Sequence, residues 1–571
     1  MKKYFEYIKP QIPKMSFGLF IKFIGTIMDL LLPWILAFMI DDVVPTKNKS
    51  NIIFWGCMMV LFSILAVTAN IVANRMASRV AMNTTQKIRY DLFKKILYLS
   101  CKQIDDFTIP SLESRLTTDT YNLHQMTGSM QRLGVRAPIL LIGGIIITLS
   151  LDPILSLTLI SVLPIIGYTV YKISKKGIPL YTEQQKATDN MVRVVRENAV
   201  GVRIIRALSK SDFEQQRFDS VNNEVTGKET KASVIMAISN PLMNLFFYLG
   251  LTMVILVGAF RVNSGFTQAG TIIAFLTYFT IILNAMLSIT RMFVMLSKAI
   301  ASAKRINEVL TAEEDLKMYP IDHVDNDYHI EFNNVSFSYN KKQNNVDDIS
   351  FKLKKGETLG IIGATGCGKS TIINLLIRFY DPDKGQIRIN GDNINSIPFN
   401  KLHSKFGIVF QNDILFADSI GENISFGRKL PNEEIEKAAE FAQAKLFIDD
   451  LEEGYSYNLT SKGTNISGGQ KQRLLISRAI ASNPEILILD DSSSALDYKT
   501  DAEFRKVLLN NYKDTTTIII AQRISSIRNA DLIIVMDEGK IIVMGKHSDL
   551  IKDCTLYKQI SDSQMGEKQY E

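Results

Sequence analysis

The sequence predicts an α-helical membrane domain with six transmembrane helices, followed by an α/β P-loop domain. Long apolar runs occupy only the first 310 of the 571 residues. Beyond residue 328, short Val/Ile-rich strands alternate with helical patterns and glycines, as in an α/β domain. With 46% hydrophobic and 22% charged residues, the chain fits a division between lipid and water. We therefore expect a membrane domain at 1–310, a linker at 311–328 and a soluble domain at 329–571.

The spans come first along the chain. A helix crosses the hydrocarbon core with about 20 mostly apolar residues. One such run alone could equally be a buried core helix, but several together in one part of the chain indicate membrane spans. Runs of this length lie at 16–40, 52–73, 133–151, 153–171, 241–260 and 271–293.

Charge sets the predicted orientation. The long segments between spans two and three, and between spans four and five, are rich in Lys and Arg. The positive-inside rule places both segments, both termini and the soluble domain on the cytoplasmic side of the cytoplasmic (inner) membrane. These segments have few Gly or Pro and show helical apolar spacing. We expect helices that extend roughly 30 Å or more beyond the bilayer.

Charged residues also fall inside the spans. On the translocon scale, a charge at mid-bilayer costs about 2.5–3.5 kcal/mol. Lys22 can reach the cytoplasmic interface. Asp29 lies deeper, so it either lines a polar cavity or pairs with another helix. Arg291, late in the sixth span, has the same alternatives or sits at the cytoplasmic end.

Other residue types exclude function classes. The chain has 65 basic and 58 acidic residues, a net charge of +7 spread over its whole length, so no nucleic-acid partner is expected. Its four cysteines show no CxxC spacing, and neither a zinc site nor thioredoxin chemistry is indicated.

The soluble half carries a phosphate-binding loop. A strand at 359–362 runs into G-x-x-x-x-G-K-S and then into a helix, which is the context this motif requires. Its backbone N–H groups and the helix N-terminus can hold phosphates. Lys369 would reach the β- and γ-phosphates. The loop comprises Gly363, Ala364, Thr365, Gly366, Cys367, Gly368, Lys369, Ser370 and Thr371.

A magnesium ion is expected beside the loop. The apolar strand 486–490 ends in Asp490, which fits a Walker B carboxylate on Mg²⁺. The hydroxyl of Ser370 can supply a second ligand. The predicted cofactors are therefore ATP and Mg²⁺.

Further motifs resemble ATP-binding cassette (ABC) proteins. The run 465–473 is similar to their signature motif, 410–412 to the Q-loop, and 494–497 to the D-loop. Tyr339 stands where the family has an aromatic that stacks on adenine. The resemblance implies that Gln411 joins the Mg²⁺ shell. It also implies that the following residues act on the ATP of a second chain: Ser467, Gly468, Gly469, Gln470 and Asp497.

Six spans followed by one cassette resemble an exporter-type half-transporter over nearly the whole chain. Residues 114–119 and 197–206, the latter followed by 212–214, resemble the family's two intracellular loops, whose short coupling helices dock on the cassettes. The resemblance implies coupling roles for Arg115, Asp119, Glu197, Arg206 and Asp212. It also implies dimerisation, because each signature serves the nucleotide held by the other cassette.

Two residues depart from the family pattern. Asp491 replaces the catalytic Glu, and its side chain is shorter by roughly 1.5 Å. Gln522 replaces a His that contacts the γ-phosphate, and Gln carries no positive charge. Both changes affect hydrolysis and leave the ATP-holding residues intact. The chain thus resembles the hydrolysis-impaired subunit of heterodimeric bacterial exporters; the alternative is a homodimer in which Asp491 suffices as base.

The predicted function is ATP-driven export of a small amphipathic molecule, such as a drug, lipid or peptide. The alternatives are an ATP-gated channel or regulatory membrane ATPase, and import by an exporter-like architecture. Met and aromatic residues of the last two spans suit adaptable apolar contacts but serve helix packing equally well.

Overall fold

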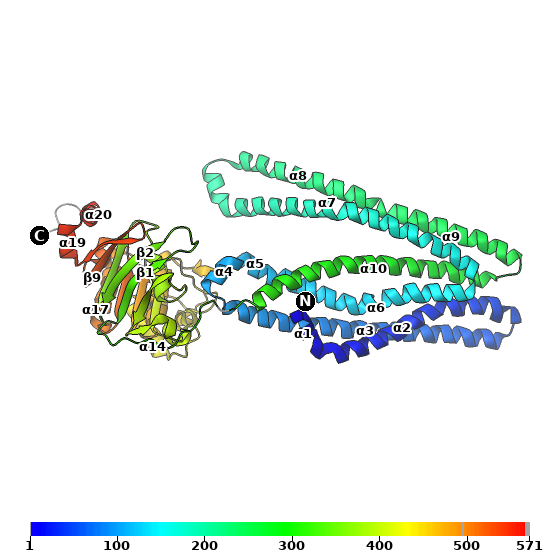
Figure 1. Cartoon of the computed structure of the whole chain (residues 1–571), viewed down its shortest axis with the longest axis horizontal. Helices are drawn as coiled ribbons and strands as arrows, with labels where there is room; N and C mark the ends of the chain where they lie inside the picture. Colours follow the sequence, from blue (N-terminus) through cyan, green and yellow to red (C-terminus); the bar gives the residue numbers. More distant parts are fainter. Residues whose placement is uncertain (1, 314, 493–495, 566–571) are drawn as a thin grey trace. The chain divides into compact units, whose positions relative to one another are not determined.

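The computed structural model describes residues 2–313, 315–492 and 496–565 (Figure 1). The chain divides into two compact units. The membrane unit comprises Met1–Tyr98 and Ile109–Ala312, and the soluble unit comprises Leu99–Thr108 and Glu313–Glu571. The soluble unit therefore includes a short helix from the first half of the sequence, α4 (Cys101–Phe107).

Within the described residues, six helical stretches of the membrane unit are long and apolar enough to cross a bilayer, as predicted for this part of the chain. The fifth candidate span joins α8 to α9. The helices of the unit are α1 (Lys2–Ile8), α2 (Ile12–Phe38), α3 (Lys49–Leu97), α5 (Ile109–Ser114), α6 (Thr120–Leu151), α7 (Pro153–Ala207), α8 (Ser211–Ala237), α9 (Ser239–Asn263) and α10 (Ala269–Leu310).

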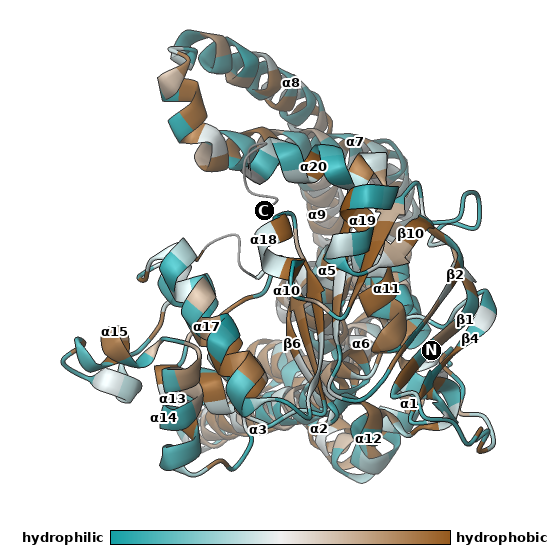
Figure 2. Cartoon of the chain, turned by 90° about the vertical axis from the view of Figure 1, so that its left-hand side faces the viewer, coloured by the Kyte–Doolittle hydropathy of each residue, from teal (hydrophilic) through white to brown (hydrophobic). Residues whose placement is uncertain are grey.

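Several of these helices extend well beyond a bilayer. α3 has 49 residues and α7 has 55, lengths of about 70–80 Å at 1.5 Å per residue. α7 and α8 run side by side (Figure 1). Lys228 Nζ on α8 lies 2.7 Å from Glu183 Oε2 on α7. The part of α8 next to the α7–α8 turn is mainly hydrophilic (Figure 2), as expected of a helix segment outside the lipid.

A single aspartate explains the tight turn between α6 and α7. Asp152 is the N-cap of α7, and its Oδ1 accepts hydrogen bonds from the backbone N–H groups of Ile154 and Leu155 at 2.9 and 3.2 Å. Its Oδ2 accepts a hydrogen bond of 2.8 Å from Arg261 Nε. The N-cap stabilises the start of α7, and the ion pair ties α9 to this turn.

The soluble unit contains two sheets. In the four-stranded sheet the order is β2-β1-β4-β5, with antiparallel pairing. In the six-stranded sheet it is β10-β9-β3-β8-β7-β6, parallel except for the β10–β9 pair. The strands are β1 (Ile330–Phe337), β2 (Val346–Leu353), β3 (Thr358–Gly363), β4 (Lys384–Ile389), β5 (Asp392–Asn393), β6 (Phe406–Val409), β7 (Ile486–Asp490), β8 (Thr516–Ile520), β9 (Leu532–Asp537) and β10 (Lys540–Gly545).

Most Ile and Leu side chains of the parallel strands are buried, and the strands are coloured mainly hydrophobic in Figure 2. Such runs are typical of parallel strands covered on both faces. The helices of the unit, besides α4, are α11 (Lys369–Leu376), α12 (Phe399–His403), α13 (Ile420–Ser425), α14 (Asn432–Phe441), α15 (Lys445–Asp449), α16 (Gly468–Ile480), α17 (Tyr498–Asn511), α18 (Ile524–Ile527), α19 (His547–Asp553) and α20 (Thr555–Met565).

Part of the predicted linker is attached to the four-stranded sheet. Val324 N–H donates to Gly391 O at 3.0 Å. Asp322 Oδ2 accepts a 2.7 Å hydrogen bond from Arg388 Nη2, and Lys317 O accepts one of 2.6 Å from the fully buried Arg378. These bonds fix this stretch of the linker to the soluble unit.

Candidate functional site

The phosphate-binding loop joins the carboxyl end of β3 to the start of α11. Gly366 and Gly368 have φ values of +87° and +99°, a region that glycine adopts without steric cost. A Cβ atom at position 368 would lie 2.5 Å from Asn345 O. Gly368 is therefore required both by its backbone conformation and by the close approach of the β1–β2 connection.

Most of the predicted ATP-site residues meet at one pocket of about 270 Å³. It lies at the carboxyl ends of parallel strands, where open α/β sheets bind ligands. Of the predicted residues, Tyr339 does not line the pocket, and neither do the loop residues Gly363, Ala364 and Cys367. The pocket is lined by Asn345, Thr365, Gly366, Gly368, Lys369, Ser370, Thr371, Gln411, Asp490, Asp491, Ile520 and Gln522.

Asn345 is a lining residue that the sequence motifs do not reveal. It lies in the connection between β1 and β2, outside the loop motif. Its backbone N–H donates to Phe337 O at 2.8 Å, and its Oδ1 accepts from Tyr339 N–H at 3.1 Å. Asn345 thus links the phosphate-binding loop to the backbone of the predicted adenine-stacking residue.

The residues expected to hold Mg²⁺ lie together. Ser370 Oγ donates to Asp490 Oδ2 at 2.9 Å, and Gln411 lines the same pocket. Burial raises the pKa of Asp490, while the Ser370 hydrogen bond and the Lys369 charge oppose that shift. A hydroxyl, a carboxylate and an amide oxygen are hard ligands suited to Mg²⁺, so the donor set fits this ion.

Lys369 lies over its own loop. Its Nζ donates to Gly363 O at 2.9 Å and to Ala364 O at 2.7 Å. These acceptors are neutral carbonyls, whereas phosphate oxygens are negatively charged, so a contact with phosphate adds the attraction between opposite charges. The ammonium is therefore positioned to exchange carbonyl oxygens for phosphate oxygens.

The two departures from the family pattern contact each other. Gln522 Nε2 donates to Asp491 Oδ2 at 2.9 Å. Asp491 has φ +50°, an uncommon backbone conformation for a residue other than glycine, and its N–H donates to Ile520 O at 2.9 Å. Burial raises the pKa of Asp491. The carboxylate expected to polarise water is therefore engaged by the residue that replaces the histidine.

Tyr339 lies outside the phosphate pocket in an aromatic cluster. Its ring makes edge contacts with Phe337 and Tyr380, at centroid distances of 4.9 and 5.0 Å. Its hydroxyl accepts a 3.1 Å hydrogen bond from Asn374 Nδ2 on α11. The residue is 43% exposed, so the ring is fixed in orientation while still accessible to an adenine base.

The signature residues form an exposed helix start that does not line this chain's own pocket. Ser467 is the N-cap of α16: its Oγ accepts from Gln470 N–H at 3.2 Å, and Gln470 Oε1 accepts from Ser467 N–H at 2.8 Å. A Cβ at Gly468 would meet no atom within 4 Å. With the adjacent Gly469, this helix start can be approached closely by an anion from another molecule.

Asp497 caps the next helix of the D-loop region. It accepts a 2.9 Å hydrogen bond from Thr500 N–H at the start of α17, and that bond helps to lower the pKa of its carboxyl group. The D-loop residues Ser494 and Ala495 lie outside the described residues.

The predicted coupling residues lie in the membrane unit. Arg115 and Asp119 are buried against α10: Arg115 Nη1 donates to Arg305 O at 2.7 Å, and Asp119 accepts from Ser302 Oγ at 2.8 Å. Glu197 pairs with Arg193 on α7 and Arg217 on α8. Arg206 and Asp212 are exposed beside the α7–α8 turn.

Helix α4, which belongs to the soluble unit although it comes from the first half of the sequence, was not predicted from the sequence. Tyr380 Oη donates to Asp105 Oδ2 at 2.6 Å. Ser100 Oγ donates to Asp315 at 2.9 Å, and Gln103 Nε2 donates to Glu313 O at 2.6 Å. The only local signal is a capping box of Ser100 and Gln103, which predicts a helix start but no docking partner.

The two residues predicted as cavity candidates, Asp29 and Arg291, have different partners in the structure. Asp29 Oδ2 lies 3.0 Å from Arg136 Nη2 on α6, so this aspartate has a partner on another helix. Arg291 is exposed on α10, and its Nη2 donates to Ser288 Oγ at 3.4 Å.

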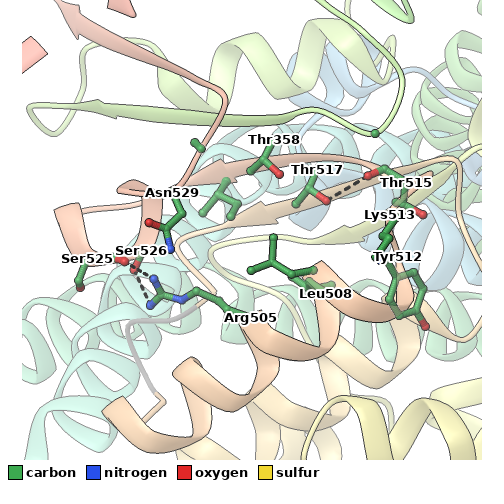
Figure 3. A pocket seen from close by; sticks show the side chains of 14 residues that line it. Thr358, Arg505, Leu508, Tyr512, Lys513, Thr515, Thr517, Ser525, Ser526 and Asn529 are labelled. Carbon is green, nitrogen blue, oxygen red and sulfur yellow. Dashed lines mark hydrogen bonds between the residues drawn. The ribbon is translucent and has the colours of Figure 1, made fainter. Parts of the chain in front are cut away.

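A second pocket of about 210 Å³ lies between α17, α18 and the six-stranded sheet. Arg505 of α17 points toward the α18 turn (Figure 3) and donates to Ser525 O and Ser526 Oγ. The arginine therefore ties the helix after Asp497 to the segment after Gln522.

Comparisons with known proteins agree with this arrangement. Residues 15–286 match the ABC transporter transmembrane region, and residues 346–494 match the ABC transporter family. The uncharacterized ABC transporter ATP-binding protein YfiB of Bacillus subtilis (strain 168) is 32% identical over 568 residues, covering 99% of both chains. The uncharacterized ABC transporter ATP-binding protein Rv1273c of Mycobacterium tuberculosis (strain ATCC 25618 / H37Rv) is 31% identical over 569 residues. The match covers 98% of this chain and 97% of Rv1273c.

The fold is also found in a solved structure, that of a bacterial Atm1-family ABC exporter with ATP bound. The TM-score is 0.81 at 23% identity, over 97% of this chain and 99% of the other. This likeness establishes a shared fold.

Proposed function

The chain belongs to the ABC transporter family, and we propose that it is one half of an exporter that moves a small amphipathic molecule or peptide across the cytoplasmic membrane. The observation that carries this proposal is the pocket where Lys369, Ser370 and Asp490 meet, on the same chain as six candidate spans. Magnesium-bound ATP would supply the charge that this pocket is built to hold.

ATP binding drives the cycle by linkage. ATP shifts the conformational equilibrium only as far as it binds the closed cassette pair better than the open one. The closed pair brings the exposed helix start of α16 to the nucleotide of the other chain. Helix α4 is bonded to Tyr380 and follows α3 in the chain after a three-residue connection, 98–100. We propose that it transmits this movement to the membrane helices.

We further propose that the second chain differs from this one. The carboxylate of Asp491 accepts a hydrogen bond from the side-chain amide of Gln522. The Asp491 side chain is also shorter than that of Glu. A misplacement of about 1 Å can lower a rate on the order of 10²-fold. This chain would hold ATP for long periods and, through Ser467 and Asp497, complete a competent site on its partner.

Transport direction tests the exporter function. Inside-out vesicles containing the complex purified from native membranes should concentrate a fluorescent amphipathic dye when Mg-ATP is added outside. A complex carrying Lys369→Ala should concentrate less dye, because nucleotide is held less well at this chain's site. Dye that only equilibrates would instead support a channel, and ATP-dependent loss of preloaded dye would support import.

Subunit composition tests the heterodimer. The intact complex, isolated through a tag on this chain, is weighed by native mass spectrometry. We expect one copy of this chain and one chain of another mass, with Glu and His at the positions matching Asp491 and Gln522. A complex of twice this chain's mass with transport-coupled ATPase activity would support the homodimer and contradict the proposal.

A further inference from the structure

The six spans predicted from the sequence contain more basic than acidic residues. Asp29 is the sole Asp or Glu in the six predicted spans, which contain three basic residues, Lys22, Arg136 and Arg291. Charged residues inside a membrane protein are unfavourable unless they are paired or face a polar cavity. One carboxylate cannot pair with three cations, so positive charge remains uncompensated in this part of the molecule.

The contacts around Asp29 show which cation it pairs with. Its Oδ2 accepts hydrogen bonds from Arg136 Nη2 at 3.0 Å and from Asn70 Nδ2 at 3.2 Å. Lys22 is buried and donates instead to Asn74 Oδ1 at 3.1 Å. Asp29 thus holds the Arg136 guanidinium, and Asn70 holds Asp29. Lys22 is bonded to a neutral amide.

A pocket of about 270 Å³ adjoins this cluster, between α6 and α10. Arg136 forms part of its wall, and Ser288, the acceptor of the Arg291 hydrogen bond, forms another part. The remaining lining is mainly apolar: Leu133, Ala137, Leu140, Thr280, Ile281, Asn284 and Ala285. The pocket is therefore mainly apolar but has two positive charges beside it. Arg136 lines the pocket, and Arg291 is hydrogen-bonded to the lining residue Ser288.

Arg136 has hydrogen-bonding capacity to spare. Its side chain is 40% exposed. Its Nε is buried, and within the described part of the chain it has no hydrogen-bond partner. A guanidinium carries five N–H donors in a planar fork that matches two oxygens of one anion. A purely structural ion pair with Asp29 would leave this donor unsatisfied.

We propose that this pocket binds the head group of an amphipathic organic anion, and that such anions are the substrate class of the exporter. The inference rests on the proposed export function. A carboxylate, sulfonate or phosphate would accept from Arg136 and gain from the charge of Arg291, while the apolar lining contacts the tail. Asp29 is a positioning residue that orients Arg136.

A matched pair of probes tests this inference. Inside-out vesicles containing the purified native complex are given 11-(dansylamino)undecanoic acid or its neutral carboxamide. Both share one apolar body, so the comparison isolates the charge. We expect ATP-dependent uptake of the acid with a KM about tenfold lower than that of the amide, the scale of one charge-assisted hydrogen-bond pair.

Variants locate the binding site. Arg136→Gln should raise the KM for the acid about tenfold and leave that for the amide unchanged, with partial recovery in Arg136→Lys. Arg291→Gln should act in the same direction and keeps the inference testable if Arg136→Gln fails to assemble. The matched control is Arg79→Gln, an exposed arginine of α3 outside the pocket lining, which should behave as wild type.

Three outcomes would overturn the inference. The first is an equal KM for the acid and the amide, and the second is unchanged acid transport in both arginine variants. The third is competition by inorganic phosphate as strong as that by the acid, because phosphate lacks the apolar body that the pocket lining would contact. If the neutral amide or another uncharged dye is still concentrated, export stands and only the anion inference fails. If no probe is concentrated, the proposed function fails with it.

Discussion

Gln522 and Asp491 form one unit at the hydrolytic side of the ATP pocket. The amide of Gln522 donates to the carboxylate at 2.9 Å, whereas a histidine in its place could carry positive charge. Burial raises the pKa of Asp491, and its side chain reaches less far than that of Glu, so this carboxylate is a short-reaching candidate base. The two departures are therefore better understood together than as separate substitutions.

Changing both residues toward the family pattern should restore hydrolysis at this site. We expect the complex with Asp491→Glu and Gln522→His to release phosphate up to about twice as fast as wild type, because a second site then turns over. Asp491→Asn, the matched control, should change the rate less than about twofold. Phosphate release at saturating Mg-ATP measures both. A loss of most activity in Asp491→Asn would show that this carboxylate is the working base.

The sequence predicted the residues of the ATP pocket well where the motif is local. A strand, a glycine loop and a lysine are consecutive, so their spacing already implies the loop geometry seen between β3 and α11. Asn345 and the Gln522–Asp491 bond were not predicted. Both depend on which segments lie side by side after folding, and neither has a local pattern.

At the scale of elements, α4 is bonded within the soluble unit to the aromatic cluster around Tyr339. Tyr339 contacts the Tyr380 ring at 5.0 Å, and Tyr380 donates to Asp105 of α4 at 2.6 Å. Burial and the Asp105 carboxylate both raise the pKa of Tyr380, so its hydroxyl stays protonated as the donor. A nucleotide that moves Tyr339 would therefore act on α4 through one neighbouring ring.

Tyr380→Phe should weaken coupling and leave ATP binding intact. The variant keeps the ring beside Tyr339 and removes the hydrogen bond to Asp105, typically a contribution of about 1.5–3 kcal/mol when one partner is charged. We expect dye transported per ATP hydrolysed to fall about two- to fivefold. Tyr319→Phe, at an exposed tyrosine of the linker, is the control. Parallel losses of transport and ATPase activity would argue against a coupling role.

Elements with strong periodicity were predictable and short ones were not. The apolar runs predicted the six spans because about 20 consecutive apolar residues are the length that a helix needs to cross the hydrocarbon core. α4 has only seven residues, CKQIDDF, too few to show a periodic face. The sequence resemblance directed attention to Arg115 and Asp119 downstream, which the structure places against α10.

At the scale of the whole molecule, one chain lacks part of a complete ATP site. In the ABC family, the signature motif that completes each site comes from the other cassette. The exposed helix start at Ser467 and Gly468 does not line the pocket that holds Lys369. In the proposed dimer, a second chain supplies the corresponding helix start, and this chain supplies its own in return. The competence of the two sites then depends on different residues, and a defect at Asp491 affects only one of them.

In the proposed heterodimer, the two ATP sites of the complex turn over unequally. The direct measurement is photo-crosslinking of the native complex during turnover, with azido-ATP labelled either at the α- or at the γ-phosphate, followed by separation of the chains. We expect this chain to retain γ-label nearly equal to its α-label, and the second chain to retain α-label and lose γ-label. Equal loss of γ-label from both chains, or two identical chains, would contradict it.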